Sequence, residues 1–274
     1  MGSFLAASKG VFSCPILILS FLTTIFLQVL SNLANDYGDT VHGADSDQRE
    51  GPSRMVQAGH ISPRSMKLAM GVFALLSLVF GVWLIRISLP AGPSFYLFLA
   101  MGILAIVGAV TYTVGYKPYG YMGLGDLSVF IFFGWLGVIG TYYLHTHAID
   151  WTIFLPASTC SFFAVGVLNL NNIRDIESDA AVGKRSIPVR IGRPNAVKYH
   201  AFLLITGLLC AALYAWIHYR HPINYFFLIV TPMLYINIKA AATRVNAQEL
   251  DPFLKQLAIT SLIFTLTFGI GQVL

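Results

Sequence analysis

The sequence predicts an all-α, polytopic membrane protein, in which a bundle of helices crosses the bilayer several times. Two compositional features predict this fold class: 56% of the residues are apolar and only 11% are charged. A soluble domain carries about 25% charged residues, so this composition excludes a disordered chain and makes a water-soluble globule a poor fit. The third observation is that the few charges are absent from eight long stretches. We expect a single transmembrane domain over residues 1–274.

The expected elements follow from these stretches in chain order. Residues 1–8 are small and apolar but too short to cross, so we expect a shortened first helix or the end of one that begins earlier. Eight stretches of at least 18 residues without Asp, Glu, Lys or Arg then follow, and a bilayer core needs roughly 17–25 residues of apolar helix. They are 10–35, 68–85, 87–116, 127–149, 151–173, 199–219, 221–238 and 256–274.

The loop charges predict the orientation in the membrane. If the chain crosses alternately, loops 36–67, 115–126, 174–198 and 239–255 share one face. Of the 17 basic residues only Lys9, Arg86 and Arg220 lie on the other face, so the positive-inside rule makes the basic face cytoplasmic. This sorting also explains the net charge of +5 without a nucleic-acid partner. Of the 12 acidic residues, only Asp150 lies on the other face. Acidic residues contribute little to orientation, so the positive-inside rule does not explain why the rest lie on the cytoplasmic face.

Two acidic stretches stand out on this face. In the first, Asn32, Asp36 and Asp39 are spaced i, i+4, i+7. They share one helical face if the preceding helix continues to about residue 40.

In the second stretch, Asn172, Asp175 and Asp179 are spaced i, i+3, i+7, which again predicts one helical face. Each stretch ends a span that runs from outside to inside, and four spans separate them. We therefore expect two acidic faces that converge across a bundle.

Carboxylate and amide oxygens are the ligands of Mg²⁺, which usually shares its site with a phosphate-bearing substrate. Facing carboxylates repel each other and also a diphosphate, so such a site needs a divalent metal. Lys117, Lys184 and Arg185 would complete an anion site. The implied chemistry is departure of a diphosphate whose charge the metal neutralises. Solvated helix ends, a secondary transporter and a lipid-phosphate phosphatase are the alternatives, although transporter sites lie near the midplane, where these spans carry no charges.

Three segments carry a resemblance to a known family: SNLANDYGDTVHGADSD, TYTVGYKPYGYMGLGD and LNLNNIRDIESDAAVGKRSIPVRIG. From about residue 28 to the end, the chain resembles the UbiA superfamily of intramembrane aromatic prenyltransferases. It is most similar to the branch that prenylates 1,4-dihydroxy-2-naphthoate in menaquinone biosynthesis. Gly43 followed by Asp45 suits this branch better than the 4-hydroxybenzoate branch of ubiquinone biosynthesis.

The resemblance implies nine transmembrane helices around a central cavity, in the bacterial inner membrane, with Asp-rich cytoplasmic loops capping the cavity. It implies Mg²⁺-dependent transfer of a polyprenyl group from polyprenyl diphosphate to 1,4-dihydroxy-2-naphthoate, with loss of CO₂ and diphosphate, which gives demethylmenaquinone. The catalytic, metal-holding residues would be Asp36, Asp39, Asp175 and Asp179. Substrate contacts would come from Asn32, Asn35, Asp45, Tyr112, Lys117, Asn172, Lys184 and Arg185. Asp126 is a candidate general base, and a helix-capping carboxylate is the equally open alternative.

Overall fold

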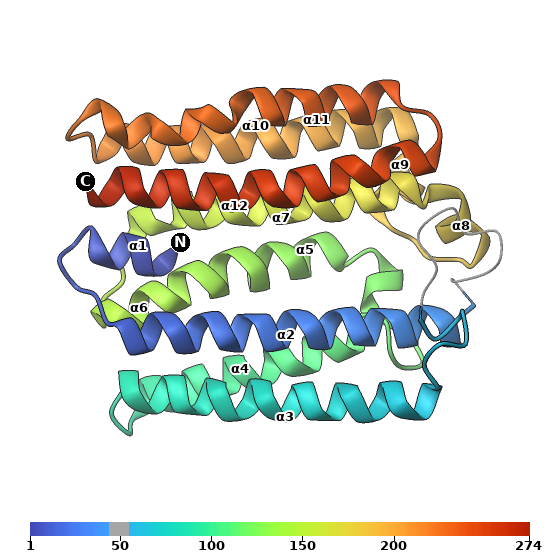
Figure 1. Cartoon of the computed structure of the whole chain (residues 1–274), viewed down its shortest axis with the longest axis horizontal. Helices are drawn as coiled ribbons and strands as arrows, with labels where there is room; N and C mark the ends of the chain where they lie inside the picture. Colours follow the sequence, from blue (N-terminus) through green and yellow to red (C-terminus); the bar gives the residue numbers. More distant parts are fainter. Residues whose placement is uncertain (44–54) are drawn as a thin grey trace. The chain divides into compact units, whose positions relative to one another are not determined.

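The computed structural model describes residues 1–43 and 55–274, and every regular element in these ranges is a helix (Figure 1). The elements are α1 (Gly2–Ala7), α2 (Cys14–Val41), α3 (Pro63–Ser88), α4 (Pro93–Thr111), η1 (Tyr119–Met122), α5 (Gly125–Val129), η2 (Phe130–Gly140), α6 (Thr141–Thr146), η3 (Trp151–Ile153), α7 (Phe154–Arg174), α8 (Ile176–Ala181), α9 (Ile187–Ile191), α10 (Arg193–Ile217), η4 (Pro222–Val230), α11 (Thr231–Thr243), η5 (Ala247–Leu250) and α12 (Asp251–Val273).

Within the described residues, eight helices or runs of successive helices are long and apolar enough to cross a membrane. They are Cys14–Val41, Pro63–Ser88, Pro93–Thr111, Gly125–Thr146, Trp151–Arg174, Arg193–Ile217, Pro222–Thr243 and Ala247–Val273. Each overlaps one of the eight charge-free stretches, so the prediction of a polytopic all-α membrane protein is confirmed. The residues that precede the first span form α1, as expected of a helical segment.

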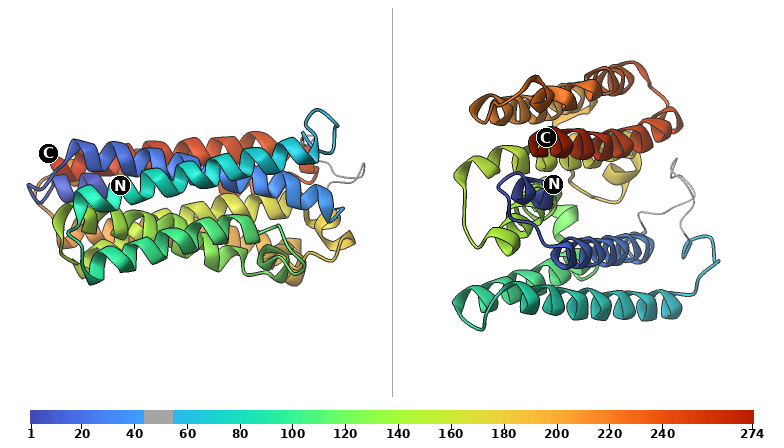
Figure 2. Two further views of the ribbon diagram at one scale, coloured as in Figure 1. Left: turned by 90° about the horizontal axis from the view of Figure 1, so that it is seen from below. Right: turned by 60° about the vertical axis from the view of Figure 1, so that its left-hand side comes forward.

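The chain divides into two units. The first comprises Met1–Phe12, Asp126–Ile176 and Ile187–Leu274, and the second comprises Ser13–Gly125 and Glu177–Ser186. In the second unit α2, α3 and α4 lie side by side (Figures 1 and 2). Leu30 and Ala34 of α2 pack there with Met66 and Met70 of α3, because apolar residues at i and i+4 fall on one face of each helix.

In the first unit α7 packs against α10 and α12, and α12 also contacts η4 and α11 (Figure 2). Its centre is aromatic: Phe163, Phe227, Phe264 and Phe268 are almost completely buried and meet with ring centroids 5.1–5.7 Å apart. Aromatic pairs at this separation add about 0.5–1.5 kcal/mol each to the area they bury. The end of α7 is packed by a second cluster, in which Leu170 and Ile173 meet Ala196, Ala241 and Leu250.

The two acidic stretches differ in local structure. The helix of the first continues to Val41, as expected, so Asn32, Asp36 and Asp39 do share one face of α2. The corresponding prediction for the second stretch is wrong. Helix α7 ends at Arg174, Asp175 has φ −95° and ψ 15°, and Asp179 lies in the separate short helix α8. Spacing in the sequence could not reveal this break, because nothing in the side-chain types forbids a continuous helix there.

Candidate functional site

The first acidic stretch begins with residues that the fold already uses. Asn32 is exposed and its side-chain oxygen accepts a hydrogen bond from Gln28 at 3.2 Å. Asp36 accepts from the backbone N–H groups of Met55 and Val56, at 3.1 and 3.3 Å. The carboxylate therefore holds residues 55–56 against α2 as well as being a candidate ligand. Asp45 lies outside the described residues.

Asp39 is the deepest acid of this stretch, with 6% of its surface exposed. The Tyr121 hydroxyl donates a hydrogen bond to its Oδ1 atom at 2.9 Å. Across the ring of Tyr121 lies the Lys184 ammonium, 5.6 Å from the ring centroid, and this ammonium donates to Oδ1 of Asp179 at 3.0 Å. Within the second unit, the first and second acidic stretches therefore meet around Tyr121 and Lys184.

The end of α2 also packs closely on the segment after α4. Thr113 donates its hydroxyl to the Ala34 carbonyl at 2.8 Å and contacts Oδ1 of Asn35 at 3.2 Å. A methyl group at Gly38 would lie 2.5 Å from the Thr113 carbonyl oxygen, so only glycine permits this approach. These contacts fix the segment that carries the next group of predicted residues.

Tyr112 directly follows α4, and its ring packs edge to face on Tyr119 with centroids 5.4 Å apart. Lys117 is exposed and its ammonium lies 5.8 Å from the ring centroid of Tyr116. Arg185 is also exposed, while its backbone N–H donates to the Tyr121 carbonyl at 2.9 Å. Lys184 is thus a buried cation of this unit's candidate site. Arg185, the next residue in the sequence, and Lys117, in the loop that also carries Tyr121, are exposed cations.

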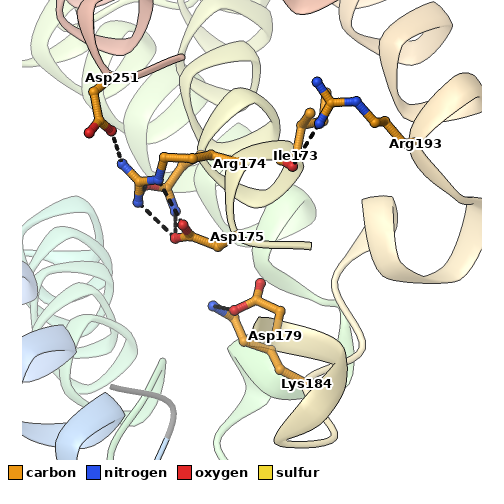
Figure 3. A network of polar contacts seen from close by, with 8 residues as sticks. Ile173, Arg174, Asp175, Asp179, Lys184, Arg193 and Asp251 are labelled. Atoms are coloured by element: carbon orange, nitrogen blue, oxygen red, sulfur yellow. Dashed lines mark hydrogen bonds and ion pairs between the residues drawn. The ribbon is translucent and has the colours of Figure 1, made fainter. Parts of the chain in front are cut away.

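The first unit holds Asn172 and Asp175 at the end of α7, both buried. The Arg174 guanidinium grips Asp175 with two hydrogen bonds of 2.7 Å, from Nε to Oδ1 and from Nη2 to Oδ2 (Figure 3). Its Nη1 atom donates at 2.7 Å to Asp251, the first residue of α12, and Nη2 also donates to Asn171. Bidentate guanidinium–carboxylate pairs are among the strongest and most directional hydrogen bonds in proteins.

Reasoning from the sequence missed Tyr121 in the second unit, and Arg174 and Asp251 in the first unit. For Arg174 a signal was present, since it precedes Asp175 directly and carries the opposite charge. Tyr121 lies in the same loop as Lys117, but nothing about its residue type indicated a bond to a carboxylate far away in the chain. Asp126, the candidate base, lies in the first turn of α5 and accepts a hydrogen bond from Tyr199 at 3.0 Å.

Asp150, the one acid expected on the opposite face, belongs to a separate network. It pairs with Lys9 at 3.1 Å and accepts from the backbone and hydroxyl groups of Thr152. Burial alone would raise the pKa of Asp150, but the hydrogen bonds from Thr152 and Lys9 and the Lys9 charge outweigh it and lower the pKa. This acid is therefore held ionised as a structural partner.

The donor set at the acidic stretches suits a hard cation. The side chains of Asp36, Asp39, Asp175 and Asp179 present carboxylate oxygens, and amide oxygens accompany them, which matches the preference of Mg²⁺. In the parts of the chain that the structure describes, no group of three or more His, Cys, Asp or Glu residues is arranged to hold a metal ion. Each of the four carboxylates instead accepts hydrogen bonds from the chain itself.

Together, the fold and the site define a multi-pass helical membrane protein with paired acidic and basic groups at the helix ends. The chain belongs to the UbiA prenyltransferase family, whose sequence model matches residues 1–262. The resemblance identified from the acidic segments is thereby confirmed.

Two relatives are similar over most of their length. The 1,4-dihydroxy-2-naphthoate octaprenyltransferase of Haemophilus influenzae is 45% identical over 260 residues, covering 95% of this chain and 84% of the relative. The Escherichia coli protein of the same name is 40% identical over 271 residues, covering 99% and 88%.

The fold is also similar to a solved structure. A UbiA homologue from Archaeoglobus fulgidus, bound to GPP and Mg²⁺, aligns with a TM-score of 0.68 at 17% identity, covering 99% of this chain and 93% of that one. At this identity the likeness shows the fold alone.

Proposed function

We propose that this protein transfers a polyprenyl group from polyprenyl diphosphate to 1,4-dihydroxy-2-naphthoate. The C–O bond of the prenyl diphosphate breaks, a C–C bond to the naphthoate ring forms, and CO₂ and diphosphate leave, which gives the quinol form of demethylmenaquinone. The observation that carries this proposal is the 45% identity to a protein named for this activity, over 95% of the chain. Family membership and the two acidic stretches support it.

Asp36, Asp39, Asp175 and Asp179 would hold Mg²⁺, with Asn32, Asn35, Asp45 and Asn172 in support. When bound, the metal neutralises the charge that develops on the leaving diphosphate. The A. fulgidus homologue with GPP and Mg²⁺ supports the requirement for a divalent metal. The oxygen-only donor set of this chain fits that role.

The basic residues bind the diphosphate rather than the metal. Lys184 binds the diphosphate by turning its ammonium from Asp179 toward phosphate oxygens, and the exposed Lys117 and Arg185 add positive charge for the anion's approach. Arg174 donates hydrogen bonds to both carboxylate oxygens of Asp175 and so keeps this side chain in one orientation. Tyr112 would face the cavity that takes the acceptor ring.

The location follows from composition and loop charge. Eight spans in the described residues support a multi-pass membrane protein. For the bacterial inner membrane that we propose, the basic loops favour an orientation with the acidic stretches on the cytoplasmic side. One functional domain over residues 1–274 remains our proposal, and it is supported by the family model, which matches residues 1–262 and so includes parts of both units.

One assay tests the activity. Membranes containing the protein receive 1,4-dihydroxy-2-naphthoate, 4-hydroxybenzoate, prenyl diphosphates of several lengths and Mg²⁺, and mass spectrometry identifies the products. We expect a prenylated naphthoquinol that has lost CO₂, no product with EDTA, and recovery on addition of Mg²⁺. Prenylated 4-hydroxybenzoate alone, release of orthophosphate, or vesicle uptake without prenylation would contradict the proposal.

The metal assignment is tested with Asp36→Asn and Asp39→Asn. Asp39→Asn keeps an oxygen that can accept the bond from Tyr121, and Asp36→Asn keeps one of the two oxygens that accept from Met55 and Val56, while the charge is removed in both. We expect turnover to fall about 100-fold or more. Glu249→Gln, in an exposed pair with Arg244, is the control and should leave turnover unchanged. Near-normal turnover of both Asp variants would refute the assignment.

A further inference from the structure

Tyr121 lies at the junction of the two acidic stretches in the second unit. We propose that Tyr121 is a positioning residue that couples Asp39 to Lys184, with its hydroxyl orienting the carboxylate and its ring holding the ammonium. This inference rests on the proposed prenyl transfer, because it assigns Asp39 to the metal and Lys184 to the diphosphate.

The hydroxyl of Tyr121 acts on Asp39. A carboxylate on a helix can rotate about two side-chain bonds, and a ligand that is not held loses affinity through this freedom. The 2.9 Å bond from the Tyr121 hydroxyl fixes Oδ1 of Asp39. Groups that orient a metal ligand in this way are typically worth 10–100-fold in metal affinity.

The ring of Tyr121 acts on Lys184. Its ammonium lies 5.6 Å from the Tyr121 ring centroid, within the 6 Å range of cation–π attraction. The same ammonium pairs with Asp179 at 3.0 Å. When a diphosphate competes for the ammonium, the ring attraction persists, because it does not depend on the carboxylate. The ring therefore keeps Lys184 near the site while it exchanges one anion for another.

The backbone of Tyr121 is itself held in place. It lies in the short helix η1, and the Tyr121 carbonyl accepts the Arg185 backbone N–H at 2.9 Å. The next residue back, Gly120, donates to the Tyr112 carbonyl at 3.0 Å. The His42 ring packs 5.4 Å from the Tyr121 ring. Tyr121 is therefore held by contacts with the end of α2, the loop after α4 and the loop after α8. A side chain held in this way can couple the positions of these three segments.

These two contacts make separable predictions. Tyr121→Phe removes the hydroxyl and keeps the ring, so we expect the Mg²⁺ concentration for half-maximal activity to rise roughly 10-fold, with the KM for prenyl diphosphate unchanged. Tyr121→Leu also removes the ring, so the KM for prenyl diphosphate should rise as well. The KM for the naphthoate should stay constant in both.

A binding measurement is independent of turnover. Purified protein in detergent is titrated with Mn²⁺ in the presence of inorganic pyrophosphate, and free Mn²⁺ is measured by electron paramagnetic resonance. Tyr121→Phe should weaken Mn²⁺ binding roughly 10-fold. The matched control is Tyr116→Phe, the same change on a tyrosine of the same loop that is 94% exposed, and it should bind like the wild type.

Equal Mn²⁺ affinity of Tyr121→Phe and wild type would overturn the inference and leave the proposed function standing. If the wild type binds Mn²⁺ and pyrophosphate but prenylates nothing, the proposed function fails instead. Should Tyr121→Phe not fold, as judged by circular dichroism, 3-fluorotyrosine is placed at position 121 of the otherwise unchanged protein. Its ¹⁹F resonance should shift with saturating Mg²⁺ and pyrophosphate, and an unchanged resonance would equally overturn the inference.

Discussion

At Arg174 a single guanidinium donates to two carboxylates, Asp175 beside it and Asp251 at the start of α12. Only 5% of the Arg174 side chain is exposed, so its charge and that of Asp175 interact with little screening by water. Loss of one partner from such a pair leaves a buried charge without compensation, which is far costlier than loss of an exposed ion pair. The stability of this helix junction therefore depends on Arg174.

We predict that Arg174→Gln lowers the free energy of unfolding by about 3–5 kcal/mol, because Asp175 becomes a buried charge without its cation. Arg174→Lys should cost less, since the charge remains while the two-pronged geometry is lost. Unfolding in mixed detergent and dodecyl sulfate measures both.

The control for Arg174 is Arg244→Gln. Arg244 pairs with Glu249 at 3.7 Å, and its side chain is 53% exposed, so the change should cost less than about 1 kcal/mol. Equal losses for the two arginines would contradict the special role of Arg174.

Also at the residue scale, the sequence singled out four acids as candidate ligands but did not predict their hydrogen-bond partners. Asp36, Asp39, Asp175 and Asp179 were all singled out by spacing and type, and each accepts a hydrogen bond from another residue of the chain. The partner of Asp39 lies 82 residues further along the chain, and one partner of Arg174 lies 77 residues away. Pairings over such separations arise from packing, which local pattern does not encode.

At the scale of elements, α2 illustrates how close two segments can approach. A methyl group on Gly38 would meet the backbone carbonyl oxygen of Thr113 at 2.5 Å, and backbone cannot rotate away as a side chain can. The hydroxyl bond from Thr113 to Ala34 depends on the same approach. This contact places the loop that carries Lys117 and Tyr121 beside the first acidic stretch.

We predict that Gly38→Ala destabilises the protein by about 1–3 kcal/mol and lowers prenyl transfer, because the loop after α4 must move. Gly71→Ala, in the interior of α3, is the matched control. No atom lies within 4 Å of a methyl group at Gly71, so better helix propensity should raise stability by up to about 1 kcal/mol. Thermal melting in detergent compares the two, and a neutral Gly38→Ala would refute the close approach.

The helices themselves were largely predictable and their breaks were not. Hydropathy located every span, since a run of apolar residues reports a local property. The end of α7 at Arg174 was missed because one of the bonds that stabilise it comes from Asp251, 77 residues away. A helix end that depends on contacts with residues far away in the chain is hard to predict from the residues around it.

For the whole molecule, the charge asymmetry of the loops makes a prediction about orientation. Ala58 lies in a loop expected to be cytoplasmic, and Ala91 lies in the opposite loop between α3 and α4; both are exposed. With Cys14, Cys160 and Cys210 replaced by Ala, a membrane-impermeant maleimide should label Ala91→Cys in spheroplasts.

Ala58→Cys should react only after the membrane is permeabilised. The two variants control for each other, because both place a single thiol at an exposed alanine position. The reverse labelling pattern would overturn the cytoplasmic assignment of the acidic stretches and with it the access of a cytoplasmic diphosphate to the site.

The sequence by itself determined the fold class, the position of the spans in the described residues and the family, and it singled out the acidic residues that we propose for the site. These follow from composition, hydropathy and short motifs, because a helix in lipid must satisfy its own backbone and reveals itself by its length and lack of charge. Only the tertiary structure decided that Asp36 caps the backbone at 55–56, that Tyr121 joins Asp39 to Lys184, and that Arg174 ends α7. Such contacts depend on how side chains from distant segments pack, and this information is spread over the whole chain.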